Sequence, residues 1–266
     1  MGRGTSDLEL EAKRVDLKIK GKCALVTGGS RGTGRAVVEL LAAEGARVAF
    51  FSRVEEQVRE TERKVRAAGG FCQGSVVEME DQDAYVAWLH SAVSSIGGCD
   101  IFIHNASASG SRATQDWERN LRIDVLGAVT GIEHLTSALS EGDGGAVVLM
   151  ASTAALETFS RPQAFNALKA AIITYGKQVS QVLGPKRIRV NTVSPGPVFF
   201  PGGNWEFIQQ TMPDRYSATL AQIPLGRLGA TEDVARAVAF LASPAASFIT
   251  GANLVIDGGF TKRVQF

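Results

Sequence analysis

A glycine-rich turn between an apolar run and a helical stretch constrains the fold of this chain more than any other feature. The apolar run 23–27 is followed at once by Gly28-Gly29-Ser30-Arg31-Gly32-Thr33-Gly34, then by a helical pattern over 35–44 and a second apolar run over 47–51. This order of strand, turn, helix and strand forms one βαβ unit. Glycines let the backbone approach a pyrophosphate, and the following helix directs free N–H groups at the phosphates. We therefore predict nucleotide binding; tight packing of the strand against the helix is the alternative.

Strand and helix patterns alternate along the rest of the chain. Helices are predicted over 54–68, 81–96, 118–139, 163–183 and 231–241, and strands over 71–77, 100–104, 146–150, 188–193 and 253–256. Continuous apolar strands that alternate with helices are typical of a parallel sheet covered on both faces. We predict a single-domain, Rossmann-like, doubly wound α/β fold with seven parallel strands over residues 20–266, after a flexible N-terminal extension over residues 1–19.

The composition narrows the class of function. Lys and Arg number 28 against 27 Asp and Glu, so nothing favours nucleic acid or an acidic membrane surface as a partner. The three cysteines have no CxxC spacing and the three histidines no metal-ligand spacing, so we expect no disulfide framework and no metal. No apolar stretch approaches twenty residues, and the N-terminus lacks a signal-peptide core. The expectation is a soluble cytoplasmic protein without a membrane span.

Polar or turn-forming residues follow five of the predicted strands. They are Gly28, Ser52, Asn105, Ser152 and Pro195. In open parallel sheets, ligands bind outside the carboxyl ends of the strands. The sequence therefore predicts one composite site at that edge of the sheet.

The chain resembles the short-chain dehydrogenase/reductase family over roughly residues 20–260. The matching motifs are Thr27-Gly28-x-x-x-Gly32-x-Gly34, Asn105-Ala106, Ser152, Lys169, Asn191, Pro195-Gly196 and Thr250-Gly251 with Asp257-Gly258-Gly259. The resemblance implies hydride transfer between a nicotinamide cofactor and a small molecule, interconverting a ketone and a secondary alcohol. It also implies a homodimer or homotetramer, formed through the helices 118–139 and 163–183 and through the C-terminal helix and strand.

The family's proton donor is missing from the matching position. In the family a serine polarises the carbonyl oxygen, a tyrosine moves the proton, and a lysine four residues later holds the nicotinamide ribose. Here Ser152 and Lys169 match, but Phe165 stands thirteen residues after Ser152, where the tyrosine is usual. Phenylalanine has no titratable proton, and loss of a general acid costs about 10²–10⁴ in rate. We therefore expect an impaired enzyme, either a natural relative with weakened redox activity or an engineered Tyr→Phe variant.

A second departure is Asp124, where the family usually has asparagine. As a fourth candidate catalytic residue, Asp124 can pair with Lys169 or support a water relay; a structural hydrogen bond within the helix is the alternative. Tyr175 is expected to face away from Phe165 on the same helix, whereas Tyr216 is a remote candidate for a replacement phenol. Two other hypotheses stay open: a non-redox cyclase or lyase with the nucleotide as scaffold and Asp124 as acid/base, and a catalytically silent cofactor-binding protein.

Cofactor choice has its own signal at the end of the second strand. NAD-preferring sites place an acid there, whereas this sequence has Ser52 and Arg53, with Arg31 in the glycine turn. Guanidinium groups bind phosphate as a planar fork, so we predict NADP; solvated surface arginines are the alternative. Ser75 replaces an acid that often meets adenine. The predicted cofactor-binding residues are Gly28, Ser30, Arg31, Gly32, Thr33, Gly34, Ser52, Arg53, Ser75, Val76, Asn105, Ala106, Lys169, Pro195, Gly196 and Val198.

The resemblance places the substrate loop at residues 197–226, which are rich in aromatic side chains. An apolar lid over a hydrophobic or aromatic substrate is one interpretation, and ordinary packing of a short helix pair is the other. The predicted substrate-binding residues are Ser107, Ser152, Phe199, Trp205 and Tyr216.

Overall fold

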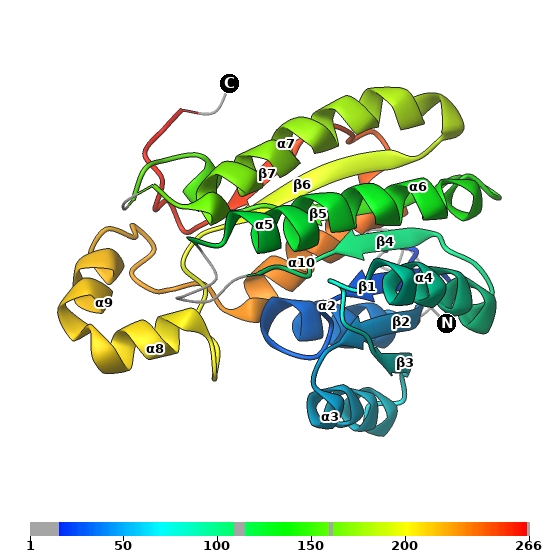
Figure 1. Cartoon of the computed structure of the whole chain (residues 1–266), viewed down its shortest axis with the longest axis horizontal. Coiled ribbons are helices and arrows are strands. Elements are labelled where there is room, and N and C mark those ends of the chain that lie inside the picture. The colour runs from blue at the N-terminus through cyan, green and yellow to red at the C-terminus, as the bar shows by residue number, and fades with distance from the viewer. Residues whose placement is uncertain (1–15, 109–114, 160–161, 265–266) are drawn as a thin grey trace, which may run out of the picture.

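The computed structural model describes residues 16–108, 115–159 and 162–264, which place a parallel sheet between two layers of helices (Figure 1). The strands are β1 (Cys23–Thr27), β2 (Arg47–Ser52), β3 (Phe71–Val76), β4 (Ile101–His104), β5 (Ala146–Met150), β6 (Arg189–Pro195) and β7 (Asn253–Ile256). The helices are α2 (Gly32–Ala43), α3 (Glu55–Ala67), α4 (Gln82–Ile96), α5 (Trp117–Asn120), the π-helical η2 (Leu121–Leu126), α6 (Gly127–Leu139), α7 (Ala164–Leu183), α8 (Asn204–Thr211), α9 (Pro213–Leu220) and α10 (Thr231–Ala242). The remaining short 3₁₀ turns include η3 (Thr153–Ala155).

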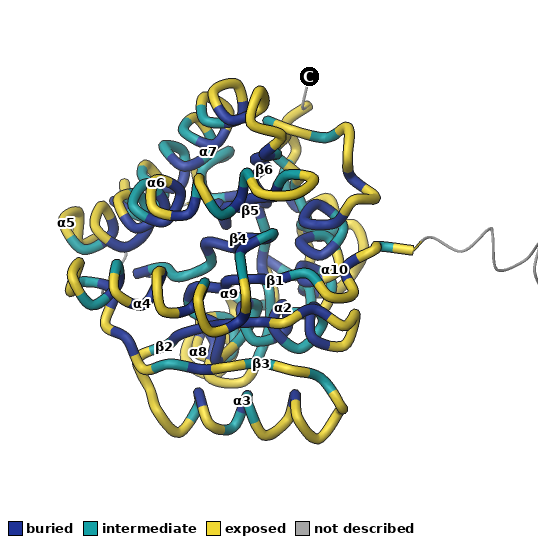
Figure 2. The backbone as a smooth tube through the Cα atoms, turned by 90° about the vertical axis from the view of Figure 1, so that its right-hand side faces the viewer, coloured by how far each residue is buried: buried dark blue, intermediate teal, exposed yellow. Residues whose placement is uncertain are grey.

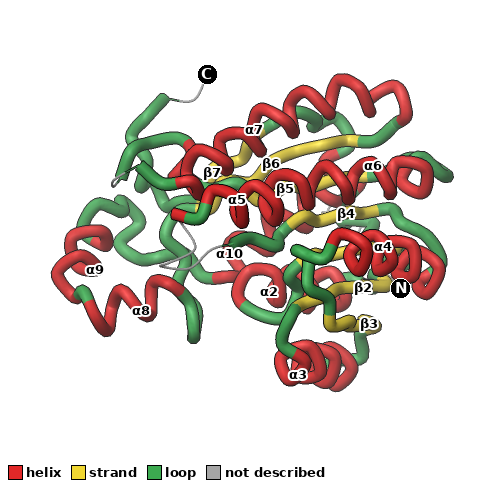
Figure 3. Tube along the Cα trace, viewed as in Figure 1, coloured by secondary structure: helices red, strands yellow, loops and turns green. Residues whose placement is uncertain are grey.

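The seven strands pair in the order β3-β2-β1-β4-β5-β6-β7, and every pairing is parallel. Figure 3 shows the strands side by side with the helices around them. This confirms the predicted doubly wound sheet. The winding reverses between β1 and β4, where Thr27 pairs with His104. Such a switch point is the place where open α/β sheets bind ligands.

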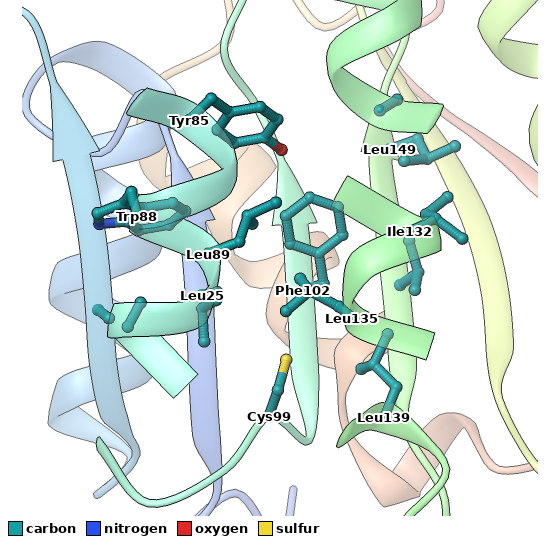
Figure 4. Packing of buried hydrophobic residues seen from close by; sticks show 14 of the residues in the cluster. Leu25, Tyr85, Trp88, Leu89, Cys99, Phe102, Ile132, Leu135, Leu139 and Leu149 are labelled. Carbon is teal, nitrogen blue, oxygen red and sulfur yellow. The ribbon is translucent and has the colours of Figure 1, made fainter. Parts of the chain in front are cut away.

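Each face of the sheet has its own hydrophobic core. On one face α4, α6 and α7 pack against the strands, and Figure 4 shows Phe102 of β4 between the side chains of α4 and α6. On the other face α2, α3 and α10 cover the sheet. Because both faces are covered, β1, β4 and β5 are buried along their whole length, as Figure 2 shows in dark blue. This burial explains why these strands read as continuous apolar runs in the sequence.

The predicted helix 118–139 is not one regular helix. A short α5 leads into the π-helical turn η2, and α6 begins only at Gly127, whose N–H group donates to the carbonyl of Arg122. A π turn inserts an extra residue and widens the helix, and such turns are frequent at functional sites. Asp124 lies in this turn and is buried. The widened turn therefore carries one of the predicted catalytic residues.

The structure differs from the prediction at the N-terminal segment and at the end of β6. Residues 1–15 of the predicted extension lie outside the described residues, while Ile19 is buried in the core against α2, so the core begins before residue 20. The predicted loop 197–226 contains the helix pair α8 and α9, which projects beside the sheet in Figure 1. The strand β6 continues to Pro195, two residues beyond its predicted end.

Candidate active site

The glycine turn is built so that an anion can approach α2. A Cβ on Gly34 would lie 2.1 Å from the carbonyl oxygen of Gly28, so the turn closes only without a side chain there. Asn105 Nδ2 donates to the carbonyls of Thr27 and Gly28, at 3.2 and 2.9 Å. Arg31 precedes α2 without a side-chain capping bond, and the first turn holds no acid. No side chain of the turn caps these N–H groups, and the residues fit a dinucleotide.

The end of β2 presents cationic and polar groups. Arg53 is exposed, and Ser52 is half-buried beside it. Ser30 of the glycine turn is buried, and its hydroxyl donates to Gln57 Oε1 at 3.3 Å, so its side chain joins the turn to α3. Arg31 is exposed and directs its guanidinium at the substrate loop, where Nη2 lies 3.4 Å from the carbonyl of Gly202.

A buried ion pair stands at the centre of the site. Lys169 Nζ lies 2.8 Å from Asp124 Oδ1, with the two side chains only 3% and 1% exposed. Lys169 Nζ also donates to the carbonyl of Met150 at 2.6 Å, and Asp124 Oδ2 accepts from the N–H of Ala108 at 3.1 Å. The contact with Asp124 is an ion pair, and Asp124 Oδ1 accepts no hydrogen bond from the described residues, so at least one of the three ammonium N–H groups is left for a ligand. The Asp124–Lys169 pairing considered from the sequence is present.

His104 is hydrogen-bonded to the backbone of Asp124, and its tautomer follows from its two partners. The hydroxyl oxygen of Thr27 accepts the N–H groups of Asn105 and Ala106, at 3.0 and 2.9 Å, which uses both of its lone pairs. Its hydrogen is therefore directed to His104 Nδ1, 3.4 Å away. His104 Nε2 then carries the ring proton and donates to the backbone carbonyl of Asp124 at 3.1 Å. This bond anchors the π turn to the end of β4.

Ser152 lies just after β5, and Phe165 lies one turn before Lys169 on α7. Ser152 follows β5 and caps η3, where its oxygen accepts the N–H of Ala154 at 3.1 Å, so its hydroxyl proton is free to be donated. Phe165 is half-buried on the first turn of α7, and its ring centroid lies 5.7 Å from Lys169 Nζ. An ammonium at this distance attracts the ring face weakly. A benzyl group, which has no proton to donate, therefore lies beside the lysine.

The remaining predicted cofactor residues lie at the strand ends. Ser75 and Val76 end β3, and Ala106 follows β4. Pro195 ends β6, and its carbonyl accepts from Thr153 Oγ1 at 3.3 Å. The next residues run on into the substrate loop, where Val198 pairs with Gly229. Ser107 Oγ is buried without a hydrogen-bond partner among the described residues, so this hydroxyl is available to a ligand.

The three aromatic residues predicted to bind substrate have a packing role. Phe199, Trp205 and Tyr216 pack around Ile223, Leu228 and Phe260 in a small hydrophobic cluster that includes side chains of α8 and α9. Phe260 in turn stacks on Phe159, with ring centroids 4.8 Å apart. These contacts agree with the second interpretation of the loop, ordinary packing of a short helix pair. The substrate role of the three aromatic residues stays a prediction. Tyr175 packs against the main core, away from the loop.

Several residues of the site are absent from the predicted site residues. They are His104, Gln57, Phe200 and Phe260. The position of His104, immediately before Asn105 at a strand end, is a usable signal. Pairing of Gln57 with Ser30, or of Phe200 with the glycine turn, has no signal in the sequence because the partners are distant along the chain.

The described residues hold no group of three or more His, Cys, Asp or Glu side chains placed to bind a metal ion. Within the same residues, no helix is both long enough and apolar enough to cross a membrane.

His104 should stay neutral in the folded protein down to about pH 4. Burial, and after it the Lys169 cation, lowers the pKa of His104 to about 4, against about 6.5 for a free histidine. Between these values the unfolded chain binds the proton more readily, so the free energy of unfolding falls as the pH drops from about 6.5 towards 4. Imidazole NMR, assigned with His104→Gln, measures the titration. A positively charged His104 at pH 6 would contradict this account.

Comparison with known proteins agrees with this geometry. Residues 28–261 match the family model described as enoyl-(acyl carrier protein) reductase. The chain is 35% identical to isoepoxydon dehydrogenase of Penicillium expansum, over 93% of this chain and 98% of the relative. It is 32% identical to 3beta-hydroxysteroid dehydrogenase 1 of Eggerthella lenta, over 93% and 97%. A short-chain dehydrogenase/reductase structure from Serratia marcescens superposes with a TM-score of 0.79 at 34% identity, over 91% of this chain and 98% of that one.

The dinucleotide turn, the lysine on α7, the serine after β5, and these matches over nearly the whole chain agree with one another. The chain belongs to the short-chain dehydrogenase/reductase family of nicotinamide-dependent oxidoreductases.

Proposed function

We propose that this protein is an NADP(H)-dependent oxidoreductase that interconverts a ketone and a secondary alcohol, with activity reduced by Phe165. The observation that carries the proposal is the Lys169–Asp124 pair next to the Met150 carbonyl, two residues before Ser152. It supports a site in which the lysine and serine frame is complete while the phenolic oxygen is absent. A bound nicotinamide dinucleotide would supply the hydride.

The chain's own residues divide the remaining work. The hydroxyl of Ser152 donates a hydrogen bond to the carbonyl oxygen of the substrate, which stabilises the charge that develops there. Lys169 offers its remaining N–H group to the ribose of the cofactor. Asp124 fixes the lysine in place and balances its charge. The Phe165 side chain has no proton to give up. Protonation of the alkoxide therefore depends on water, and this step is slow.

The proposed substrate is a small apolar or aromatic carbonyl compound or alcohol. The aromatic residues of the loop 197–226 support this chemistry, as do relatives named for a hydroxysteroid and for isoepoxydon. Ser107, with its buried and unpartnered hydroxyl, adds a polar contact for such a ligand. The proposed location is the cytoplasm.

We also propose a homodimer or homotetramer. Exposed apolar side chains lie along the α5–η2 segment and α7, with Trp117 58% and Val182 69% exposed. A second apolar surface lies near β7, where Phe248 is fully exposed. Burial of such surfaces between copies is favourable. The mass of the protein in solution, by analytical ultracentrifugation, would show a monomer if this is wrong.

Restoring the phenol should restore carbonyl reduction. Phe165→Tyr is expected to raise the rate at least tenfold, because a general acid contributes about 10²–10⁴ in rate. The measurement is the loss of nicotinamide absorbance with a panel of cyclic and aromatic ketones. The matched control is Phe165→Leu, which removes the ring without adding an acid and should give no gain.

The same experiment separates the other two hypotheses. No gain with any ketone, together with turnover that leaves the nicotinamide absorbance unchanged, would favour a cyclase or lyase with Asp124 as acid/base. Tight cofactor binding without turnover in either protein would favour a silent cofactor-binding protein.

Arg53 should set the preference for NADP. If it binds the 2′-phosphate, Arg53→Ala is expected to weaken NADP binding roughly tenfold, because a hydrogen bond to a charged group is worth about 1.5–3 kcal/mol. Binding of NAD should change little. Isothermal titration calorimetry measures both dissociation constants. Arg66→Ala, which removes an exposed arginine from the last turn of α3, is the control. Equal loss of NAD and NADP affinity would contradict the assignment.

A further inference from the structure

The substrate loop contacts the glycine turn through Phe200. A Cβ on Gly32 would lie 2.7 Å from Cζ of the Phe200 ring, so the ring rests directly on the face of Gly32 from which a side chain would project. Gly32 has a positive φ of 51° and is the first residue of α2. In dinucleotide turns the second glycine is kept free of a side chain so that the pyrophosphate can come close to the backbone. The ring thus covers the surface that the proposed cofactor needs.

Arg31 holds the ring in this place. Its guanidinium carbon lies 5.8 Å from the Phe200 ring centroid, and its Nη2 lies 3.4 Å from the carbonyl of Gly202. A cation over an aromatic face is attracted to it by the ring quadrupole. Arg31 is also one of the two arginines proposed to bind the 2′-phosphate. One guanidinium therefore has two competing partners, the loop and the phosphate.

Phe200 is connected firmly to α8. The N–H of Gly203 donates to the carbonyl of Phe200 at 3.0 Å and closes a tight turn, in which Gly202 takes a positive φ of 73°. Glu206 on the first turn of α8 accepts the N–H of Gly202 at 2.8 Å. Because this turn is short and bonded to the helix, a backbone movement at Phe200 is passed on to the start of α8.

We propose that Phe200 and Arg31 form a latch that keeps the α8–α9 segment docked on the glycine turn until a dinucleotide displaces the ring. The inference rests on the proposed cofactor function. Binding then has two parts: the pyrophosphate displaces Phe200 from Gly32, and the 2′-phosphate draws Arg31 away from Gly202. Loop release is therefore linked to cofactor binding, and NADP releases the loop more fully than NAD.

The linkage has a simple consequence for affinity. If only the unlatched form accepts the cofactor, the measured dissociation constant is the intrinsic constant divided by the unlatched fraction. Removing the ring raises that fraction, so Phe200→Ala should bind NADP and NAD more tightly, by roughly threefold or more. Phe207→Ala is the matched control, because this phenylalanine of α8 is 47% exposed. It should leave both dissociation constants unchanged.

Hydrogen exchange detects the latch without any turnover. In the cofactor-free protein, Phe200→Ala should speed backbone exchange in residues 204–211, whereas Phe207→Ala should not. Addition of NADP should speed exchange in the same residues of the unmodified chain, NAD should do so less, and neither should change the Phe200→Ala protein further.

The outcomes separate the latch from the cofactor assignment. Equal or weaker cofactor binding by Phe200→Ala, with unchanged exchange in residues 204–211, would overturn the latch and leave the cofactor assignment intact. Failure of both proteins to bind either dinucleotide would overturn the cofactor assignment and the linkage with it, whatever the exchange of the cofactor-free proteins.

Discussion

The site depends on the buried ion pair between Lys169 and Asp124. Removing a charge from water is unfavourable by several kcal/mol, so an ammonium that is 3% exposed is stable only beside a compensating partner. Asp124 supplies the opposite charge at 2.8 Å, and the Met150 carbonyl supplies a second acceptor. The pair joins α7 to the π turn and to the end of β5. Phe165 lies one turn before Lys169 on α7, and Ser152 follows Met150 by two residues.

The bonds around Asp124 connect this pair to the glycine turn. His104 donates to the Asp124 carbonyl and accepts from Thr27, whose oxygen also receives the N–H groups at the start of the next loop. Thr27, His104 and Asp124 are buried, and each of these bonds joins a donor to an acceptor. Buried hydrogen bonds of this kind favour a single arrangement because breaking one leaves a buried polar group unpaired. Cofactor turn and lysine are therefore parts of one polar network.

Phe165 provides the shape of an aromatic ring without the acidic hydroxyl group of a phenol. Ring shape and packing on α7 are kept, so the frame for a cofactor and a carbonyl group is present. Under the proposed function, proton transfer is the property that a ring without a hydroxyl group does not supply. The proposal thus combines a dinucleotide site with reduced turnover.

The parts predicted from the sequence share a physical cause. Buried parallel strands must be apolar along their whole length, so the strands appear as runs such as 23–27 and 146–150, and their carboxyl ends locate the site. The π turn at Leu121–Leu126 escaped prediction because one extra residue hardly alters the apolar pattern of a helix. Contacts such as Phe200 on Gly32 join residues far apart in the chain, and only the folded structure brings them together.

The account is tested most directly by a double-mutant cycle on the ion pair, with Lys169→Met, Asp124→Leu and the double substitution compared by their free energies of unfolding. Each single substitution leaves one buried charge without its partner and should destabilise the protein by about 3–5 kcal/mol. The double substitution removes both charges, so its loss should be well below the sum of the two. Additive losses, within about 0.5 kcal/mol, would show that the two charges do not interact and would contradict the central claim.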